Sequence, residues 1–229
     1  MKELLKITAI EGASFSGKST LIKELSEKYG IPFIGEYSDF ANKGADFPKF
    51  PYNSLEDAKK SVKFFLEIEK KRSGKAINLA LSQNLPIIMD RSPLSCIVFQ
   101  RAVSILNPEQ YSVYQYTIEQ FHTSLSKEEI IIPPSIVYIK PPSFQEFNRR
   151  VNTRGATNLP ILDDYRSGKL MELWYIKCIQ ECYDEQTSML LDGGDSISKN
   201  ANATLPFLTK SKDISSNTTL QSFQNLSSI

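Results

Sequence analysis

The sequence predicts an α/β fold in which a doubly wound, five-stranded parallel sheet carries helices on both faces. Two observations lead to this prediction: short apolar runs recur along the chain, and longer segments with helical spacing separate them. The runs are apolar nearly throughout, and such strands are buried on both faces, as in a parallel sheet. Strands that alternate with helices are typical of doubly wound domains.

The strands and helices follow in order along the chain. The five expected strands span residues 5–10, 32–35, 85–89, 135–139 and 189–191. The expected helices span residues 18–29, 56–82, 93–106, 108–125, 143–153 and 163–186. Ser54, Asn107 and Ser143 each precede a helix as N-caps, and Gly30 follows the first helix as a C-cap.

The charge balance excludes some classes of partner. The 229 residues include 27 Lys and Arg against 26 Asp and Glu, a formal net charge of +1. This balance argues against a nucleic-acid partner, because phosphate backbones are bound through a surplus of basic residues. No apolar run approaches the roughly 18 residues of a membrane span, and the first residues lack the apolar core of a signal peptide. We therefore expect a cytoplasmic protein with no membrane partner.

The three cysteines and the single histidine, His122, limit the available chemistry. An odd number of cysteines without an export signal indicates reduced thiols rather than a disulfide framework. A lone histidine argues against catalysis that is built on histidine. The site must therefore be sought among other residue types.

A shift in composition divides the chain near residue 196. Of the 34 residues from 196 to 229, 16 are Ser, Thr or Asn, which is too polar a mixture to bury much apolar surface. We expect one domain over residues 1–195 and a poorly ordered tail over 196–229. The alternative is one more helix, over residues 199–210, that packs on the core.

A glycine-rich motif follows the first expected strand and opens the first expected helix. It fills the pattern G-x-x-x-x-G-K-[ST] with Gly12, Ala13, Ser14, Phe15, Ser16, Gly17, Lys18, Ser19 and Thr20. The glycines let backbone N–H groups face a phosphate, and the helix N-terminus adds its dipole. Lys18 would bind the outer phosphates, and the Ser19 hydroxyl would bind Mg²⁺. The motif is typical of P-loop NTPases and predicts binding of ATP or another nucleoside triphosphate.

Asp90 and Arg91 end the third expected strand, where ligands bind in parallel sheets. A carboxylate in this position can hold Mg²⁺ or its water shell together with Ser19. An arginine beside it can clamp a phosphate or hydrogen-bond a sugar. Both residues are therefore candidates for catalysis.

A basic segment at about residues 143–162 is expected to form a lid over the site. It contains Arg149, Arg150 and Arg154 and then Gly155. Arginines on a closing segment would stabilise the transferring phosphoryl group and expel water. We expect Arg150 and Arg154, which are four residues apart, to serve this role from one helix face.

The segment 88–100, from Ile88 to Gln100, resembles a kinase signature. The thymidylate kinase pattern is D-R-Y-x-x-S-x-x-A-Y-Q, and this chain has Ser92 at the aromatic position. The related deoxynucleoside kinases have D/E-R-S there, which Asp90-Arg91-Ser92 fits at least as well. In the phosphate-binding loop, thymidylate kinases usually carry an acidic residue and a glycine where this chain has Ser14 and Phe15.

Other parts of the chain extend the resemblance to about residues 5–195. Phe64-Phe65-Leu66 followed by Arg72 resembles the thymidylate kinase helix L-F-x-x-x-R, whose arginine approaches the acceptor base. Residues 150–155 resemble the arginine-bearing lid, and Glu36 matches an acid that both families share. The resemblance implies that Arg72, Arg91, Gln100 and Glu36 bind the acceptor, and that the enzyme is a possible homodimer.

The chemistry of the acceptor separates the two kinase families. A hydroxyl acceptor needs a carboxylate base, for which Glu36 is the candidate. A phosphate acceptor needs arginines instead, for which Arg72 and Arg91 are candidates. The leading expectation is transfer from ATP to a nucleoside monophosphate, dTMP in particular. The alternative is a deoxynucleoside kinase that phosphorylates a 5′-hydroxyl, and a further alternative is a nucleotide-binding switch or an inactive kinase-like module.

Overall fold

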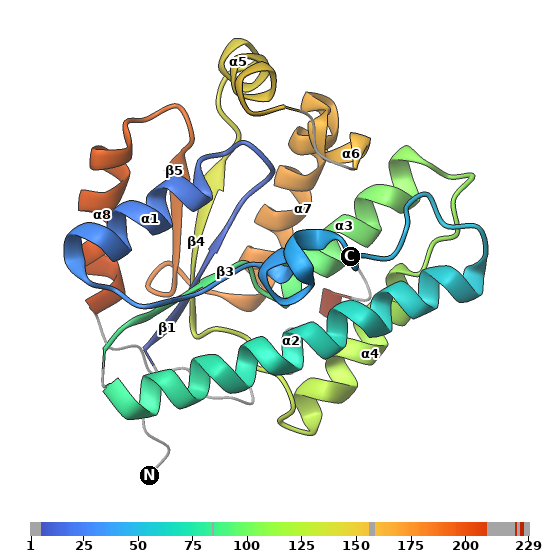
Figure 1. Cartoon of the computed structure of the whole chain (residues 1–229), viewed down its shortest axis with the longest axis horizontal. Helices are drawn as coiled ribbons and strands as arrows, with labels where there is room; N and C mark the ends of the chain where they lie inside the picture. The colour runs from blue at the N-terminus through green and yellow to red at the C-terminus, as the bar shows by residue number, and fades with distance from the viewer. Residues whose placement is uncertain (1–5, 84, 156–158, 210–222, 224, 227–229) are drawn as a thin grey trace.

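A computed structural model describes residues 6–83, 85–155, 159–209, 223 and 225–226 (Figure 1). Its sheet has five parallel strands in the order β2-β3-β1-β4-β5. These strands are β1 (Ile7–Glu11), β2 (Phe33–Ile34), β3 (Ile87–Asp90), β4 (Ser135–Lys140) and β5 (Ser188–Asp192). The predicted doubly wound sheet is therefore confirmed. Ile10 pairs with Asp90, so the segments after β1 and β3 leave the sheet side by side.

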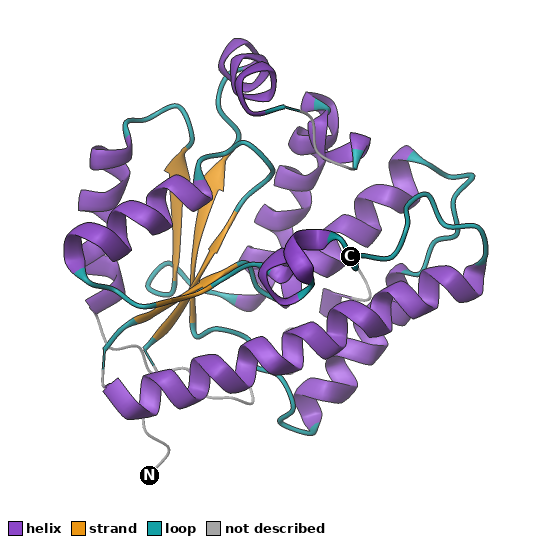
Figure 2. Ribbon diagram, in the orientation of Figure 1, coloured by secondary structure: helices purple, strands orange, loops and turns teal. Residues whose placement is uncertain are grey.

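Helices cover both faces of the sheet (Figure 2). They are α1 (Lys18–Tyr29), α2 (Leu55–Gln83), α3 (Pro93–Leu106), α4 (Tyr114–Ser126), α5 (Phe144–Arg154), α6 (Pro160–Asp163), α7 (Tyr165–Cys182) and α8 (Ile197–Thr209). Two short 3₁₀ turns, η1 (Tyr37–Phe40) and η2 (Asn42–Gly44), follow β2. Among the described residues, no helix combines the length and apolar character that a membrane span requires.

Alternate residues of β1 face the two layers of helices, as the pleat of a strand requires. Ile10 packs with side chains of α1 and α8, whereas Ala9 packs with side chains of α3, α4 and α7. Ile7 faces α2 through Ala76 and Ala80. Both faces of the central strand are therefore buried, which explains its nearly continuous apolar sequence.

Two of the predicted helices differ from those in the structure. The helix expected at 108–125 begins only at Tyr114, because residues 107–110 form a turn in which the Gln110 N–H donates to the Asn107 carbonyl at 2.9 Å. The helix expected at 163–186 corresponds to α7, which spans only Tyr165–Cys182, and the short helix α6 precedes it. Asp164 separates them and caps α7 by accepting from the Ser167 N–H at 2.8 Å.

The expectation of a poorly ordered tail is wrong for residues 197–209, which form α8. The alternative of one more helix in this region is confirmed. Ala201, Thr204 and Leu208 are buried, and α8 packs against α1. The composition was misleading because a few apolar residues with helical spacing suffice to bury one face. Residues 210–222, 224 and 227–229 lie outside the described residues.

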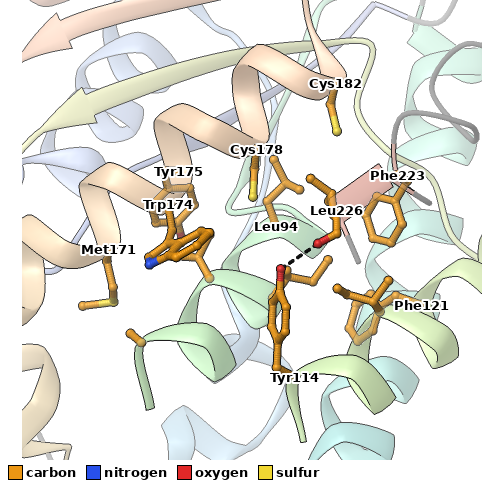
Figure 3. Close-up of a cluster of buried hydrophobic side chains, with 14 of the residues drawn as sticks. Leu94, Tyr114, Phe121, Met171, Trp174, Tyr175, Cys178, Cys182, Phe223 and Leu226 are labelled. Carbon is orange, nitrogen blue, oxygen red and sulfur yellow. Dashed lines mark hydrogen bonds between the residues drawn. The ribbon is translucent and has the colours of Figure 1, made fainter. Parts of the chain in front are cut away.

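Residues from the end of the chain complete the main core (Figure 3). Phe223 and Leu226 are fully buried among side chains of α3, α4 and α7, including Leu94, Phe121 and Cys178. The Tyr114 hydroxyl donates to the Leu226 carbonyl at 2.8 Å. The compact body is therefore not complete at residue 195.

Candidate active site

A cavity of about 960 Å³ opens at the carboxyl ends of the strands. Its walls come from the glycine-rich loop, the segment after β2, the start of α3, and α5. Of the predicted site residues, the cavity wall includes Gly12, Ala13, Ser14, Phe15, Gly17, Lys18, Ser19, Thr20, Glu36, Arg91, Gln100, Arg150 and Arg154. Ser16, Arg72 and Asp90 are not on this wall.

The P-loop, residues 12–20, requires glycine at two positions. Gly12 has a φ of +148°, and a Cβ atom there would lie 2.5 Å from the Ile139 carbonyl oxygen. Gly17 has a φ of +106° at the N-cap of α1. Any other residue would be strained at both positions. The loop can therefore keep its backbone close to the end of β4 while it curves around a phosphate.

The Lys18 ammonium group lies within the P-loop. Its Nζ donates to the carbonyls of Gly12 at 2.7 Å and Ala13 at 3.0 Å, and the side chain is buried. Burial and the nearby Arg91 charge lower the pKa of Lys18 to about 7, although Asp90 and other carboxylates oppose the shift. A triphosphate in the loop would supply the negative charge that keeps this lysine protonated.

Asp90 is buried at the end of β3. Burial raises the pKa of its carboxyl group, and the positive charges of Lys18 and Arg91 oppose this effect. Its Oδ1 has no hydrogen-bond partner among the residues that the structure describes. An unpaired buried carboxylate oxygen next to the P-loop suits a water of a hydrated cation. Asp90 and the exposed Ser19 hydroxyl therefore fit the predicted Mg²⁺ role.

Glu36, from the loop after β2, and Arg91, from the loop after β3, contact each other at the cavity wall. Arg91 Nε donates to Glu36 Oε2 at 3.4 Å, and Arg91 Nη1 lies 3.4 Å from the Gly12 carbonyl oxygen. Ser38 Oγ donates to Glu36 Oε1 at 2.9 Å. Burial favours a higher pKa for Glu36, but Arg91 and Ser38 outweigh it, so the pKa of Glu36 is lowered. The Glu36 side chain keeps 37% of its surface exposed, as an ionised base for a bound acceptor requires.

Glu11 is a fully buried carboxylate at the end of β1 that none of the sequence motifs singles out. Its Oε1 accepts from the Ser92 N–H at 2.6 Å and the Ser92 hydroxyl at 2.7 Å, and its Oε2 accepts from Ser95 Oγ at 2.8 Å. Tyr175 Oη lies 2.9 Å from the same Ser95 oxygen. Glu11 thereby joins the P-loop strand to the loop that carries Arg91. The one signal in the sequence is an acidic residue at the end of an apolar strand, a position that Asp90 also occupies on β3.

The contact with Glu11 explains why serine occupies position 92. Ser92 is fully buried, and its Oγ both donates to Glu11 and accepts from the Leu94 N–H at 3.3 Å as the N-cap of α3. An aromatic side chain offers no hydroxyl at this distance from the backbone. The position therefore matches the D/E-R-S pattern in structure as well as in sequence.

The far end of the cavity is aromatic and includes the amide of Gln100. Gln100 is buried, and its Nε2 donates to Tyr52 Oη at 3.0 Å, while its Oε1 accepts no hydrogen bond within the described part of the chain. Phe65, Phe99 and Phe121 also line this end. Flat apolar walls around an amide oxygen suit a nucleobase, which stacks on its faces and donates from its edge.

The predicted role of Arg72 as an acceptor clamp is wrong. The side chain is fully buried, and its guanidinium donates to the carbonyls of Gly35 at 3.1 Å, Asp90 at 2.6 Å and Arg91 at 2.8 Å. Nη1 is also paired with Glu69. With these partners the guanidinium faces backbone rather than the cavity. Arg72 holds the ends of β2 and β3 together, and so fixes the loops that carry Glu36 and Arg91.

The lid arginines both approach the P-loop. Arg150 Nη1 donates to the Phe15 carbonyl, Nη2 to the Gly193 carbonyl and Nε to Glu146 Oε1, each at 2.8 Å. Arg154 is exposed, with its guanidinium 5.9 Å from the Phe15 ring centroid. Arg150 and Arg154 therefore both line the cavity. Arg150 is held in place by backbone carbonyls and Glu146, whereas Arg154 is exposed.

A family comparison identifies the kind of protein that carries this site. The sequence profile of the deoxynucleoside kinase family matches residues 8–214. The chain belongs to the deoxynucleoside kinase family. A deoxyguanosine kinase of Bacillus subtilis (strain 168) is 27% identical to it over 190 residues, which cover 81% of this chain and 85% of that protein. The match to the family extends past residue 195 and includes α8.

Solved structures share the fold of this deoxynucleoside kinase family member. The structure of deoxyadenosine kinase from M. mycoides with bound dATP has a TM-score of 0.63 and 19% identity, and covers 89% of this chain and 100% of that chain. Thymidylate kinase from Candida albicans has a TM-score of 0.58 and 15% identity, and covers 88% and 90%. The predicted resemblance to P-loop kinases is confirmed. Between its two branches, the family match supports the nucleoside kinase alternative more than the dTMP kinase.

Proposed function

We propose that this chain is a deoxynucleoside kinase, which transfers the γ-phosphoryl group of ATP to the 5′-hydroxyl of a 2′-deoxynucleoside. The observation that carries the proposal is Glu36, an ionised and partly exposed carboxylate held by Arg91 and Ser38 beside the P-loop. A phosphate acceptor would need free cations there, and Arg72 is committed to backbone carbonyls.

The acceptor would lie between Glu36 and the aromatic end of the cavity. Its base would stack among the phenylalanines and donate to Gln100 Oε1, for which the described residues offer no donor. Its 5′-hydroxyl would then face Glu36 and Arg91. In this arrangement the nucleoside is positioned by side chains alone, while the triphosphate is held by the P-loop backbone.

The transfer step follows from these positions. Glu36 accepts the proton of the 5′-hydroxyl as that oxygen attacks the γ-phosphorus, and the bond from this phosphorus to the β,γ-bridging oxygen breaks. The products are ADP, a deoxynucleoside 5′-monophosphate and one proton. Lys18 and Arg154 would stabilise the charge on the transferring group. Mg²⁺, held through Ser19 and Asp90, would neutralise charge on the β- and γ-phosphates.

A coupled ADP-release assay tests the proposal. The purified chain is given Mg-ATP with each deoxynucleoside, each ribonucleoside and each deoxynucleoside monophosphate in turn. We expect release with at least one deoxynucleoside, and a Lys18→Met variant excludes contaminating kinases if it is silent. Release with dTMP alone would instead establish a thymidylate kinase. Silence with all acceptors would support the switch or inactive module.

A possible homodimer stays a prediction. Light scattering on the full chain at assay concentration distinguishes a mass near 25.9 kDa from twice that value.

A further inference from the structure

Phe15 occupies a P-loop position at which this type of residue is unexpected. Its φ is +61°, in the left-handed region that L side chains rarely adopt. The related thymidylate kinases carry glycine there, which enters this region without strain. A bulky aromatic residue that persists in a strained conformation is over-determined by its surroundings.

The Phe15 side chain contacts the lid rather than the P-loop alone. The side chain is buried, and its ring packs edge-to-face against Phe147 of α5 with centroids 5.5 Å apart. Phe147 in turn packs against Tyr165, the first residue of α7, at 5.4 Å. An aromatic row therefore runs from the P-loop through α5 to α7.

Phe15 also contacts Arg150 and Arg154 of α5, the first through its backbone carbonyl and the second through its ring. Its carbonyl oxygen accepts from Arg150 Nη1 at 2.8 Å, while its ring lies 5.9 Å below the Arg154 guanidinium. A cation above an aromatic face is attracted by the ring quadrupole. Arg154 has no ion-pair partner among the described residues, and its guanidinium lies instead over the Phe15 ring.

We infer that Phe15 is a positioning residue that docks the lid helix α5 on the P-loop and holds Arg154 over the phosphate site. The lid arginine is thereby placed before the triphosphate binds. Phe15 takes no part in the chemistry, since it acts through Arg154 and Arg150. The inference rests on the proposed function only for its turnover measurement.

Hydrogen exchange of the full chain without nucleotide tests the docking directly. Phe15→Gly removes the ring and the backbone strain together, and Phe15→Leu keeps bulk but removes the aromatic face. We expect exchange in residues 144–154 to rise about tenfold for the glycine variant and about threefold for the leucine variant. Exchange in β1 and β4 should stay at the wild-type rate.

The matched control is Phe144→Leu, on the same helix. Phe144 is 57% exposed and packs on Tyr165 at 5.4 Å, away from the P-loop. Its substitution should leave exchange in residues 144–154 unchanged within about twofold. An equal rise in this control, or no rise in the glycine variant, would overturn the inference.

Turnover provides the second measurement. We expect Phe15→Gly to lower kcat about tenfold while the ATP dissociation constant changes less than about twofold, because Arg154 acts mainly on the transferring group. Equal losses in both would show a damaged P-loop and overturn the positioning role. If wild type proves inactive with every nucleoside, the proposed function fails, and the exchange result still decides the docking of α5.

Discussion

The two ends of the cavity are built in different ways. The end that we propose binds the phosphate donor, called the donor end, is made of consecutive residues of the P-loop. Their backbone lies very close to a neighbouring loop, since a Cβ atom at Gly193 would lie 2.8 Å from the Ser16 carbonyl oxygen. The end that we propose binds the acceptor, called the acceptor end, is made of side chains, Glu36, Arg91 and Gln100, which come from separate loops and helices. Substitution at the acceptor end should therefore change what is phosphorylated, or how fast, without disturbing ATP binding.

The largest expected effect is the loss of turnover on substitution of Glu36, at the acceptor end of the cavity. Glu36→Gln keeps the size of the side chain but removes the base, so kcat should fall roughly 10²–10⁴-fold. The ATP dissociation constant, measured by calorimetry, should stay within about twofold of wild type. Glu24→Gln is the control, because Glu24 is a partly exposed carboxylate of α1 that pairs with Lys28 and does not line the cavity. A Glu36→Gln enzyme with near wild-type kcat would mean that a phosphate is the acceptor.

Arg154→Ala tests whether a side chain of α5, outside the P-loop, contributes to catalysis at the donor end. We expect kcat to fall roughly 10²–10³-fold with little change in ATP affinity, because the guanidinium stabilises charge that develops during transfer. Arg149→Ala is the matched control on the same helix, since Arg149 Nε and Nη2 both donate to the Glu146 carboxylate at 2.7 Å. Equal losses of turnover and affinity in Arg154→Ala would contradict the lid role.

The pH dependence of ligand binding should also differ between the ends. Burial lowers the pKa of Lys18 to about 7, so the unliganded lysine loses its proton as the pH rises through this value. The protonated form binds the triphosphate, and ATP affinity should fall by up to about tenfold per pH unit above it. Deoxynucleoside affinity, which depends on an already ionised Glu36, should stay constant. Calorimetry at several pH values measures both, and a flat ATP profile would contradict the shift.

The smallest expected effect concerns the pKa of Glu36, the proposed base. Ser38→Ala removes the hydroxyl that helps to lower the pKa of Glu36, so the pKa of Glu36 should rise. Glu36 serves as base only when ionised, and the acidic limb of kcat/KM should therefore move to higher pH. Activity at neutral pH should change by less than about threefold. An acidic limb that does not move would assign Ser38 a merely structural role.

The sequence predicted the donor end and the sheet because both depend on local patterns. The P-loop spacing and the apolar strands need only neighbouring residues, and they were confirmed. Arg72 was assigned wrongly, because its partners Gly35 and Asp90 are 37 and 18 residues away. Glu11 was missed for the same reason, since its hydrogen-bond donors follow more than eighty residues later.

The α8 helix was not the leading prediction because the composition of its segment is polar, not because its contacts are distant in sequence. Ser198, Asn202 and Thr209 are exposed, Asn200 and Thr204 are buried, and the few apolar residues on the buried side carry the signal. A count of residue types averages over both faces of a helix and loses this information.

The burial of Phe223 and Leu226 affects the order in which the protein folds. The hydrogen bond from Tyr114 to Leu226 joins residues 112 positions apart, so it closes a very long loop. Such contacts form late, because the entropy of loop closure must be overcome first. Contacts absent from the transition state mainly set the unfolding rate. These two side chains should therefore determine how long the native state persists rather than how quickly it forms.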